Sequence, residues 1–294
     1  MTPQQIQHIG LVIRPGIEAA VALAAQVVDW AHEQGRTVLF ESESAELFGS
    51  KAARCSSAEL VQRCDLIITL GGDGTLLSVA RHSDSKAPLF LGVNFGVLGF
   101  LTEVRPTELQ ATLERLLRGD LYIRERAMLL GILEREGKVV FSSQAVNDFV
   151  VQKGARSRLI DLDVFLDDEA IMRLRADGMI VATPTGSTAY SLACGGPIAD
   201  PSLNVMMLTP ICPHSLTSRP LVVDSDSVAR IVVPHIEDLV FLTADGQVSC
   251  ELKPGDVIRI TRAKHRLRLL SAPTRSYFEI LRTKLNWGVP NKNE

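Results

Sequence analysis

The 294-residue sequence lacks the features that would place it in a membrane, outside the cell or on nucleic acid. No stretch approaches the roughly eighteen apolar residues of a membrane helix. The first residues show no basic region followed by an apolar stretch, so we expect no secretory signal. The formal net charge is −3, whereas non-specific binding to nucleic acid or anionic lipid needs a basic surface. We therefore expect a cytoplasmic protein without nucleic-acid or membrane partners.

Cysteines are few and scattered, and they form no Cys-x-x-Cys pair. Their number is odd, so neither a zinc site nor a disulfide framework fits; they are Cys55, Cys64, Cys194, Cys212 and Cys250. This usage indicates a reducing compartment. Apolar residues, by contrast, make up 46% of the chain and charged residues 22%. This composition is typical of a protein that buries a substantial core, and the length favours two domains.

The sequence is organised around a glycine-rich turn at residues 71–75, Gly-Gly-Asp-Gly-Thr. The apolar run from Leu66 to Leu70 precedes it and predicts a buried strand. A helical pattern from Leu76 follows, with Thr75 as its expected cap. Glycines let the backbone turn sharply and approach a ligand closely, and a helix start favours an anion. The stretch therefore predicts a phosphate cradle.

The turn matches neither of the two familiar phosphate-binding loops. No Lys-Ser or Lys-Thr pair closes it, and Leu77 stands where the third glycine of a dinucleotide fingerprint would be. Asp73 also places a carboxylate where an anion should bind. Such a carboxylate is repulsive unless it holds a metal or takes a proton from an attacking hydroxyl. The alternative is that Asp73 only stabilises its own turn through a side-chain to backbone bond, which Asn could also do.

The first part of the chain alternates strand and helix patterns. We expect strands at residues 9–13, 37–40, 66–70 and 88–93 and helices at 17–32, from the Ser56–Glu59 capping box onward, and at 107–117 before Gly119. This alternation predicts a parallel sheet wrapped by helices. Ligands of such sheets bind at the carboxyl ends of the strands, where the glycine-rich turn lies.

After Asp120 the pattern changes to segments rich in Val, Ile and Leu, separated by turn pairs such as Glu136-Gly137 and Asp245-Gly246. These pairs are hairpin signals, so a mostly β domain is expected. We expect an α/β domain at residues 1–120, joined by a C-terminal helix within residues 275–294, and a β-rich domain at residues 121–274. The helical pattern at 276–286 could pack back on the first domain.

Four polar stretches in the β region look too specialised for plain strands. Asn147-Asp148 interrupts an apolar run, although a β-bulge or a strand end meeting solvent would look the same. Asp177-Gly178 precedes an apolar strand and is by default a turn. Thr183 to Ser191 collects hydroxyl groups that suit ribose, phosphate or adenine recognition, as would a capped loop. A basic cluster within residues 153–158 is either a solvated loop or a pyrophosphate contact.

Taken together, these stretches make the sequence resemble the NAD kinase family. The 71–75 turn matches its signature loop, and Asn147-Asp148 matches its Asn-Glu/Asp motif. Residues 183–190 with Gly195-Gly196 match its glycine-rich segment, and residues 94–100 are also similar to the family. The match in order and spacing covers roughly residues 8–285. Diacylglycerol and sphingosine kinases share the loop alone, so only the combination is specific.

The resemblance implies an α/β N-terminal domain with a parallel sheet, a sandwich-like β C-terminal domain and a homo-oligomer, commonly a tetramer. It implies transfer of a phosphoryl group from ATP to the 2′-hydroxyl of the adenosine ribose of NAD, giving NADP, with Mg²⁺ or another divalent metal whose ligands stay unassigned. Asp73 is implied as the base that accepts the hydroxyl proton. The implied binding residues are Gly72, Asp73, Gly74, Thr75, Asn147, Asp148, Asp177, Thr188, Ala189, Tyr190 and Ser191, with Arg158, Arg175 and Gln247 as further candidates.

Two other functions compete with this interpretation. A lipid kinase of the diacylglycerol or sphingosine type would keep the loop, but it should want a membrane-facing apolar or basic surface. A dinucleotide-binding regulator without turnover would not need a carboxylate beside phosphates, so Asp73 argues against it.

Overall fold

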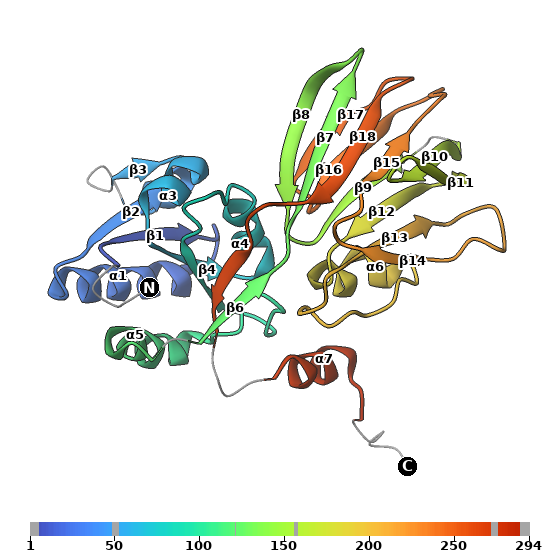
Figure 1. The fold of residues 1–294 in the computed structure, drawn as a ribbon. Helices are drawn as coiled ribbons and strands as arrows, with labels where there is room; N and C mark the ends of the chain where they lie inside the picture. The colour runs from blue at the N-terminus through green and yellow to red at the C-terminus, as the bar shows by residue number, and fades with distance from the viewer. Residues whose placement is uncertain (1–5, 49–52, 121, 156–157, 272–275, 289–294) are drawn as a thin grey trace. The chain divides into compact units, whose positions relative to one another are not determined.

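The computed structural model describes residues 6–48, 53–120, 122–155, 158–271 and 276–288. The chain divides into two compact units, Met1–Glu125 with Leu267–Glu294, and Arg126–Arg266 (Figure 1). These units differ at their edges from the expected domains, because residues 121–125 and 267–274 join the first unit. No helix among the described residues is long and apolar enough to span a membrane.

A seven-stranded sheet forms the centre of the first unit, in the order β3-β2-β1-β4-β5-β19-β6. Neighbouring strands from β3 to β19 pair in parallel, which confirms the expected parallel sheet. The strands are β1 (His8–Ile13), β2 (Thr37–Glu41), β3 (Arg54–Cys55), β4 (Leu66–Gly71), β5 (Leu89–Asn94), β6 (Ile123–Arg126) and β19 (Leu267–Leu270).

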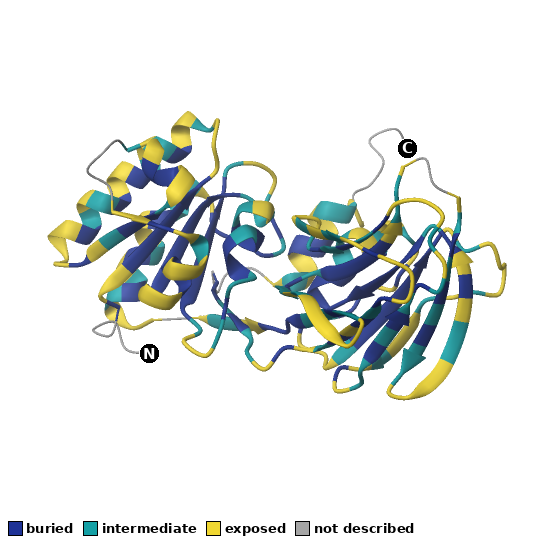
Figure 2. Ribbon diagram, turned by 90° about the horizontal axis from the view of Figure 1, so that it is seen from above, coloured by how far each residue is buried: buried dark blue, intermediate teal, exposed yellow. Residues whose placement is uncertain are grey.

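Helices cover this sheet with their apolar sides. In α1 (Glu18–Glu33) the buried residues recur every three or four positions, from Ala20 to Ala31, and the opposite side is exposed (Figure 2). The first unit also contains α2 (Ser42–Glu46), α3 (Ser57–Arg63), α4 (Asp73–Ala80), η2 (Pro106–Glu108) and α5 (Leu109–Arg118). The C-terminal helix α7 (Tyr277–Leu285), which contacts Phe100, belongs to this unit as well.

Local sequence signals predicted two helix ends correctly and the start of one helix wrongly. The capping box at Ser56 and Glu59 is present, and Gly119 ends α5 in the left-handed conformation, as expected. However, α4 begins at Asp73 with Gly72 as its N-cap, so Thr75 is not the cap. The Gly72 carbonyl already accepts from the Thr75 amide, so the helix begins three residues earlier than predicted.

The second unit is a sandwich of two six-stranded antiparallel sheets, as the resemblance implied. The sheets have the orders β11-β10-β15-β18-β7-β8 and β14-β13-β12-β9-β16-β17. One core, which includes Leu133 on β7 and Phe149 on β9, draws buried side chains from both sheets. The strands are β7 (Leu129–Arg135), β8 (Lys138–Ala145), β9 (Asp148–Lys153), β10 (Ile160–Leu166), β11 (Glu169–Ala176), β12 (Gly178–Ala182), β13 (Val205–Ile211), β14 (Leu221–Asp224), β15 (Ala229–Val232), β16 (Val240–Ala244), β17 (Val248–Glu251) and β18 (Val257–Arg262).

Two hairpin turns of this unit follow from the sequence. Glu136 and Gly137 join β7 to β8 with φ of 52° and 74°. Asp245, Gly246 and Gln247 join β16 to β17, with φ of 50° and 64° at the first two. Positive φ at two successive residues is the turn geometry that such pairs favour. The helical pattern near 186–193 is broken into η3 (Thr185–Thr188) and α6 (Tyr190–Ala193).

Candidate functional site

The glycine-rich turn lies at the carboxyl end of β4, where the expected cradle should be. An open pocket of about 640 Å³ adjoins it. Asp73 is the only acidic side chain among the described residues that line this pocket, and Arg14 and Lys284 supply its positive charge. The lining residues are Arg14, Pro15, Gly16, Ile17, Gly71, Gly72, Asp73, Asn94, Phe95, Gly96, Val97, Gly99 and Lys284.

The Asp73 carboxylate is bound by a segment almost thirty residues further along the chain. Its Oδ2 accepts from the Phe100 amide at 2.9 Å. Its Oδ1 accepts from the amides of Leu101 at 3.2 Å and Thr102 at 2.9 Å, and from the Thr102 hydroxyl at 2.7 Å. The alternative in which Asp73 stabilises its own turn is therefore wrong, because the side chain fixes the 100–102 segment instead.

Small side chains around Asp73 leave room for this arrangement. A Cβ on Gly99 would collide with Oδ1 of Asp73. The Thr102 hydroxyl, which donates to Asp73, accepts in turn from Nδ2 of Asn94 at 2.8 Å. The stretch from Asn94 to Phe100, which resembles the family, therefore shapes the surroundings of the Asp73 carboxylate.

A second polar pocket, of about 590 Å³, lies on the other side of the turn. Gly74 and Thr75 line it together with Arg14, Ser78 and Arg81, and the carboxylates of Glu41 and Glu43 line it as well. The planar guanidinium groups suit phosphate oxygens, but the two carboxylates balance their charge, so this pocket has mixed charge. The four predicted residues of the turn are thus divided between two pockets that share Arg14.

In the second unit, Asn147 connects β8 to β9, and Asp148 begins β9. The side chain of Asp148 is only 4% exposed, so the alternative of a strand end meeting solvent is wrong. Burial, with a smaller contribution from the negative charge of Asp245, raises the pKa of Asp148 to about 7. The carboxyl group therefore changes charge near neutral pH.

The segment from Thr183 to Ser191 lies beside Asn147. The Thr183 amide donates to the Asn147 carbonyl at 2.8 Å, and a Cβ on Gly186 would collide with the same carbonyl. Several hydroxyls of this segment serve its own structure, since Ser187 bonds Pro184 and Ala199, Thr188 bonds Thr185, and Ser191 bonds Thr209. Among the described residues, the buried Thr185 hydroxyl finds no hydrogen-bond partner.

Tyr190 and Asp177 come near each other at the opposite end of β12. Tyr190 is 38% exposed. Burial raises its pKa, and the charges of Cys194, Cys212 and Asp177 add smaller effects in the same direction. Asp177 forms an ion pair with Lys153 at 3.3 Å. Five residues of β12 separate Asp177 from Thr183, so these two stand roughly 15 Å or more apart along the strand.

The remaining predicted residues are less closely grouped. Arg175 is exposed on β11, in the other sheet, and Arg158 pairs with Glu237 at 3.6 Å on the surface. Gln247 lies in the β16–β17 turn, two residues from Asp245. Arg156, the middle residue of the expected basic cluster, lies outside the described residues.

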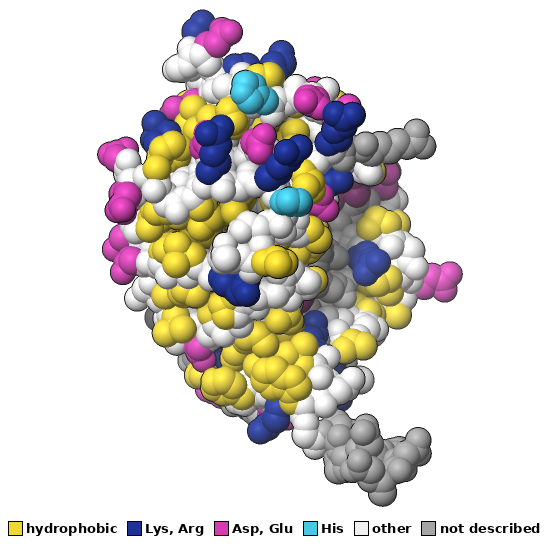
Figure 3. Space-filling view, turned by 90° about the vertical axis from the view of Figure 1, so that its right-hand side faces the viewer, with side chains coloured by type: hydrophobic (Ala, Val, Ile, Leu, Met, Phe, Trp, Pro, Cys, Tyr) yellow, Lys and Arg dark blue, Asp and Glu magenta, His cyan; other side chains and the backbone are white. Residues whose placement is uncertain are grey.

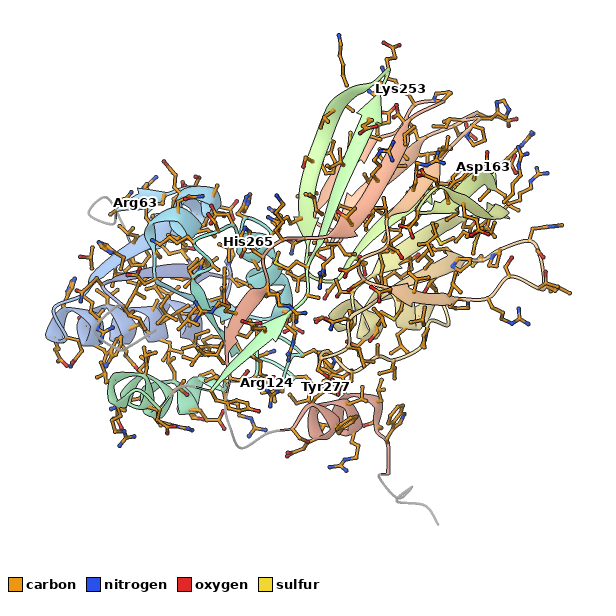
Figure 4. All side chains as sticks on the ribbon, viewed as in Figure 1. Arg63, Arg124, Asp163, Lys253, His265 and Tyr277 are labelled. Carbon is orange, nitrogen blue, oxygen red and sulfur yellow. The ribbon has the colours of Figure 1, made fainter. Side chains whose placement is uncertain are left out.

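Four residues that the two sites use escaped the sequence analysis, namely Arg14, Arg81, Asp245 and Lys284. Arg14 follows β1, and Lys284 belongs to α7, whose Tyr277 ring lies 6.1 Å from the Phe100 ring (Figure 4). The Lys284 Nζ lies 4.6 Å from the centre of the Phe100 ring. Asp245 was taken only for a turn residue, yet it accepts three backbone hydrogen bonds beside Asp148. Asp-Gly is a common pair in hairpin turns, so the sequence carries no sign of this second role.

The described residues contain no group of three or more His, Cys, Asp or Glu side chains that could hold a metal ion. Mg²⁺ often binds through one or two carboxylates together with substrate phosphates. With Asp73 in a pocket lined by Arg14 and Lys284, the side chains fit a metal that arrives with a triphosphate, and they do not form a cage of their own.

Comparison with protein families places both units. Residues 9–121 match the model of the ATP-NAD kinase N-terminal domain, and residues 146–272 match that of the ATP-NAD kinase C-terminal domain. A protein named NAD kinase from Geotalea daltonii is 45% identical over 268 residues, which are 91% of this chain and 94% of that protein. Another, from Syntrophotalea carbinolica, is 42% identical over 283 residues, 96% of this chain and 99% of that one.

Solved structures show the same fold. The yeast NADH kinase in complex with NADH superposes with a TM-score of 0.89 at 26% identity, covering 98% of this chain and 90% of that one. An NAD kinase from Archaeoglobus fulgidus in complex with ATP has a TM-score of 0.74 at 23% identity, over 95% of this chain and 99% of that one. At the latter identity only the fold is comparable.

Proposed function

The chain belongs to the ATP-NAD kinase family, and from that premise we propose that it transfers the γ-phosphoryl group of ATP to the 2′-hydroxyl of the adenosine ribose of NAD. The observation that carries this proposal is that both family domains match, over residues 9–121 and 146–272. The relatives named NAD kinase match over almost their whole lengths, and this does not favour a lipid kinase or a regulator without turnover.

In this proposal the first unit binds the phosphates of the donor. Phosphoryl transfer asks a protein mainly for positioning and for stabilisation of negative charge. The turn at Gly71 to Gly74 allows close approach of backbone, and the start of α4 favours an anion. Arg14 and Lys284 bring positive charge to the pocket beside Asp73, and Arg14 and Arg81 offer guanidinium groups in the second pocket, which Glu41 and Glu43 also line.

Asp73 is proposed as the base of the reaction. Its Oδ1 accepts three hydrogen bonds and its Oδ2 accepts one, so Oδ2 retains a lone pair for a substrate proton. The 2′-oxygen forms a bond to the γ-phosphorus, the bond from that phosphorus to the oxygen of ADP breaks, and the hydroxyl proton passes to Asp73. The four hydrogen bonds hold the carboxylate in one orientation for this transfer.

The second unit is proposed to bind NAD. Asn147 and Asp148 offer an amide and a carboxyl group that can bond ribose hydroxyls. The buried Thr185 hydroxyl, which lacks a partner among the described residues, would gain one from a ligand. Tyr190 offers a half-exposed ring for stacking, and Thr188, Ala189, Ser191, Asp177, Arg175, Arg158 and Gln247 remain proposed contacts.

A divalent metal is proposed to arrive with the triphosphate. Asp73 is the one carboxylate of the turn and would lie near this metal. When bound there, the metal would neutralise charge on the transferring group. Oligomerisation is also proposed: exposed apolar side chains on strands of the second unit, such as Val139 and Val222, suit an interface between copies. The cytoplasmic location stays a prediction of the sequence.

The proposal is tested by incubating the purified protein with NAD, ATP and MgCl₂ and assaying NADP with an NADP-specific dehydrogenase. We expect NADP only when both substrates are present. A parallel reaction with diacylglycerol or sphingosine in mixed micelles tests the lipid kinase. Phosphorylated lipid without NADP, or tight binding of NAD without any turnover, would contradict the proposal.

A further inference from the structure

The Asp245 side chain binds three consecutive backbone amides of another strand connection. Its Oδ2 accepts from the Val146 amide at 2.9 Å, and its Oδ1 accepts from the amides of Asn147 at 2.7 Å and Asp148 at 3.1 Å. The Asp245 amide donates in return to the Asp148 carbonyl at 2.9 Å. One turn residue of the β16–β17 hairpin thus fixes the segment that carries Asn147 and Asp148.

The opposite side of the same segment is held by Thr183. Its hydroxyl donates to the Val146 carbonyl at 2.6 Å, and its amide donates to the Asn147 carbonyl at 2.8 Å. Gly186 packs directly against the Asn147 backbone, where no Cβ would fit. The amides and the carbonyls of Val146 and Asn147 therefore both have fixed partners. The side chains of Asn147 and Asp148, which this backbone carries, have little freedom to change direction.

The hairpin by itself does not need a carboxylate at residue 245. A turn with positive φ at both positions is served at least as well by Asn-Gly. An ionised Asp245 also faces the carboxyl group of Asp148, and the two like charges raise the free energy of the folded state. Only a carboxylate, however, has two oxygens that can both accept, as the three amides require.

We propose that Asp245 is a positioning residue of the dinucleotide site, which holds the 146–148 backbone so that Asn147 and Asp148 meet NAD in one arrangement. The inference rests on the proposed function and deepens it, because it adds to the NAD site a residue that acts through Asn147 and Asp148 without contacting the substrate itself. Its removal should weaken NAD binding and leave the donor site of the first unit unchanged.

The test compares Asp245→Asn with Asp167→Asn. Asn keeps the size and turn preference of Asp but replaces one accepting oxygen with a donor, so one of the three amides loses its partner. Asp167 is a matched control, because it is also a hairpin turn residue with positive φ, of 46°, and accepts one long-range amide, that of Val228 at 2.8 Å. It lies on the β10–β11 hairpin, outside both candidate sites.

For Asp245→Asn we expect the NAD KM and the NAD dissociation constant from calorimetry to rise about tenfold or more, since misplacement by ~1 Å can cost 10²-fold. The ATP KM should stay within twofold. Asp167→Asn keeps an oxygen for its single amide partner, so it should change neither KM and have little effect on the melting temperature. An Asp245→Asn protein that melts early but binds NAD normally would overturn the inference, because Asp245 would then be merely structural.

Thr183 provides a second pair of variants if Asp245→Asn fails to fold. Thr183→Val removes the hydroxyl that donates to Val146, and Thr183→Ser retains it. We expect a raised NAD KM for the first and a nearly normal one for the second; equal NAD KM values in both would contradict the positioning role. A wild-type protein that neither binds NAD nor forms NADP would instead refute the proposed function itself.

Discussion

Asp73 has two sets of partners in this account, the 100–102 segment of its own chain and the hydroxyl of a substrate. The carboxylate binds three amides and one hydroxyl of that segment. From the sequence alone, Asn could fill the structural role equally well, because Asn forms similar turns. In the structure it could not, since an amide nitrogen would replace one of the two accepting oxygens.

We therefore expect Asp73→Asn to lower both activity and stability. Turnover should fall by about 10²–10⁴, the usual contribution of a positioned general base. The NAD dissociation constant should change far less, because the lost interaction matters chiefly in the transition state. One unsatisfied amide should cost about 1–3 kcal/mol of unfolding free energy. Measured kcat, NAD affinity and a denaturant melt test this; a near-normal kcat would exclude the catalytic role.

Asp148 makes the stability of the protein depend on pH. Its folded-state pKa is about 7, above the ordinary 3.8. Between these values the folded state keeps the proton and the unfolded state loses it, so the unfolding free energy falls as pH rises from about 4 to 7. Asp148→Asn removes this dependence. As the pH rises from 4 to 8, the unfolding free energy of the variant should increase relative to that of the wild type by on the order of 4 kcal/mol.

Urea denaturation of the wild type and Asp148→Asn at pH 4.5 and pH 8 measures this difference, and parallel pH curves for the two proteins would contradict it. The same variant should bind NAD poorly at both pH values. A gain in stability accompanied by lost binding is expected of a buried group that serves a ligand.

Local sequence motifs identified some residues of the two sites, whereas contacts between distant parts of the chain bring the others there. Asp73 was found because it places a carboxylate in a glycine-rich turn, and Asn147 and Asp148 because they interrupt an apolar run. Asp245 lies 97 to 99 residues from the amides that it binds, and no local pattern carries that contact. Lys284 of α7 also lines its pocket through a long-range contact that no local pattern predicts.

At the scale of elements, local patterns predicted most strands and helices but not all. β4, the turn and α4 were expected because an apolar run, glycines and a helical period follow each other directly. β13 was not among the expected strands, and Pro210, which cannot donate to a ladder, is unusual in a central strand. The structure pairs Pro210 with Met179 of β12, inside the sheet.

The segment at 99–102 should behave as one unit with Asp73. In Gly99→Ala the added Cβ would collide with the Asp73 carboxylate and the Thr102 hydroxyl. We expect kcat to fall at least tenfold and the unfolding free energy to fall by about 1–3 kcal/mol. Gly96→Ala in the same connection is the control, because its Cβ meets nothing closer than Asn94 Oδ1 at 3.7 Å. Equal melting temperatures for the two variants would show that the Asp73 contacts are unimportant.

For the whole molecule, composition and pattern predicted an α/β unit followed by a β unit, and the structure has both. The order of strands was beyond reach. β6 and β19 lie in stretches that looked like part of the β domain, yet they extend the parallel sheet of the first unit at one edge. Pairing between residues 89 and 268 depends on the whole chain folding, not on local sequence.

The surface of the second unit leads us to expect a homo-oligomer larger than a dimer. Hydrophobic side chains gather in several patches on the face in Figure 3. Exposed apolar residues of this unit include Val139 and Val140 on β8 and Leu221 and Val222 on β14. Burying such side chains between copies would be favourable. Light scattering on the purified protein measures the mass, and a stable, fully active monomer would contradict this expectation.

The most direct test of the central claim is the position of the phosphate in the product. Purified protein is incubated with NAD, ATP and MgCl₂, and the product is analysed by phosphorus NMR with proton coupling. We expect one new phosphomonoester per ATP consumed, coupled to the proton on the 2′-carbon of the adenosine ribose, and none with Asp73→Asn over the same time. Hydrolysis of ATP without a phosphomonoester, or a phosphate on any other hydroxyl, would contradict the account.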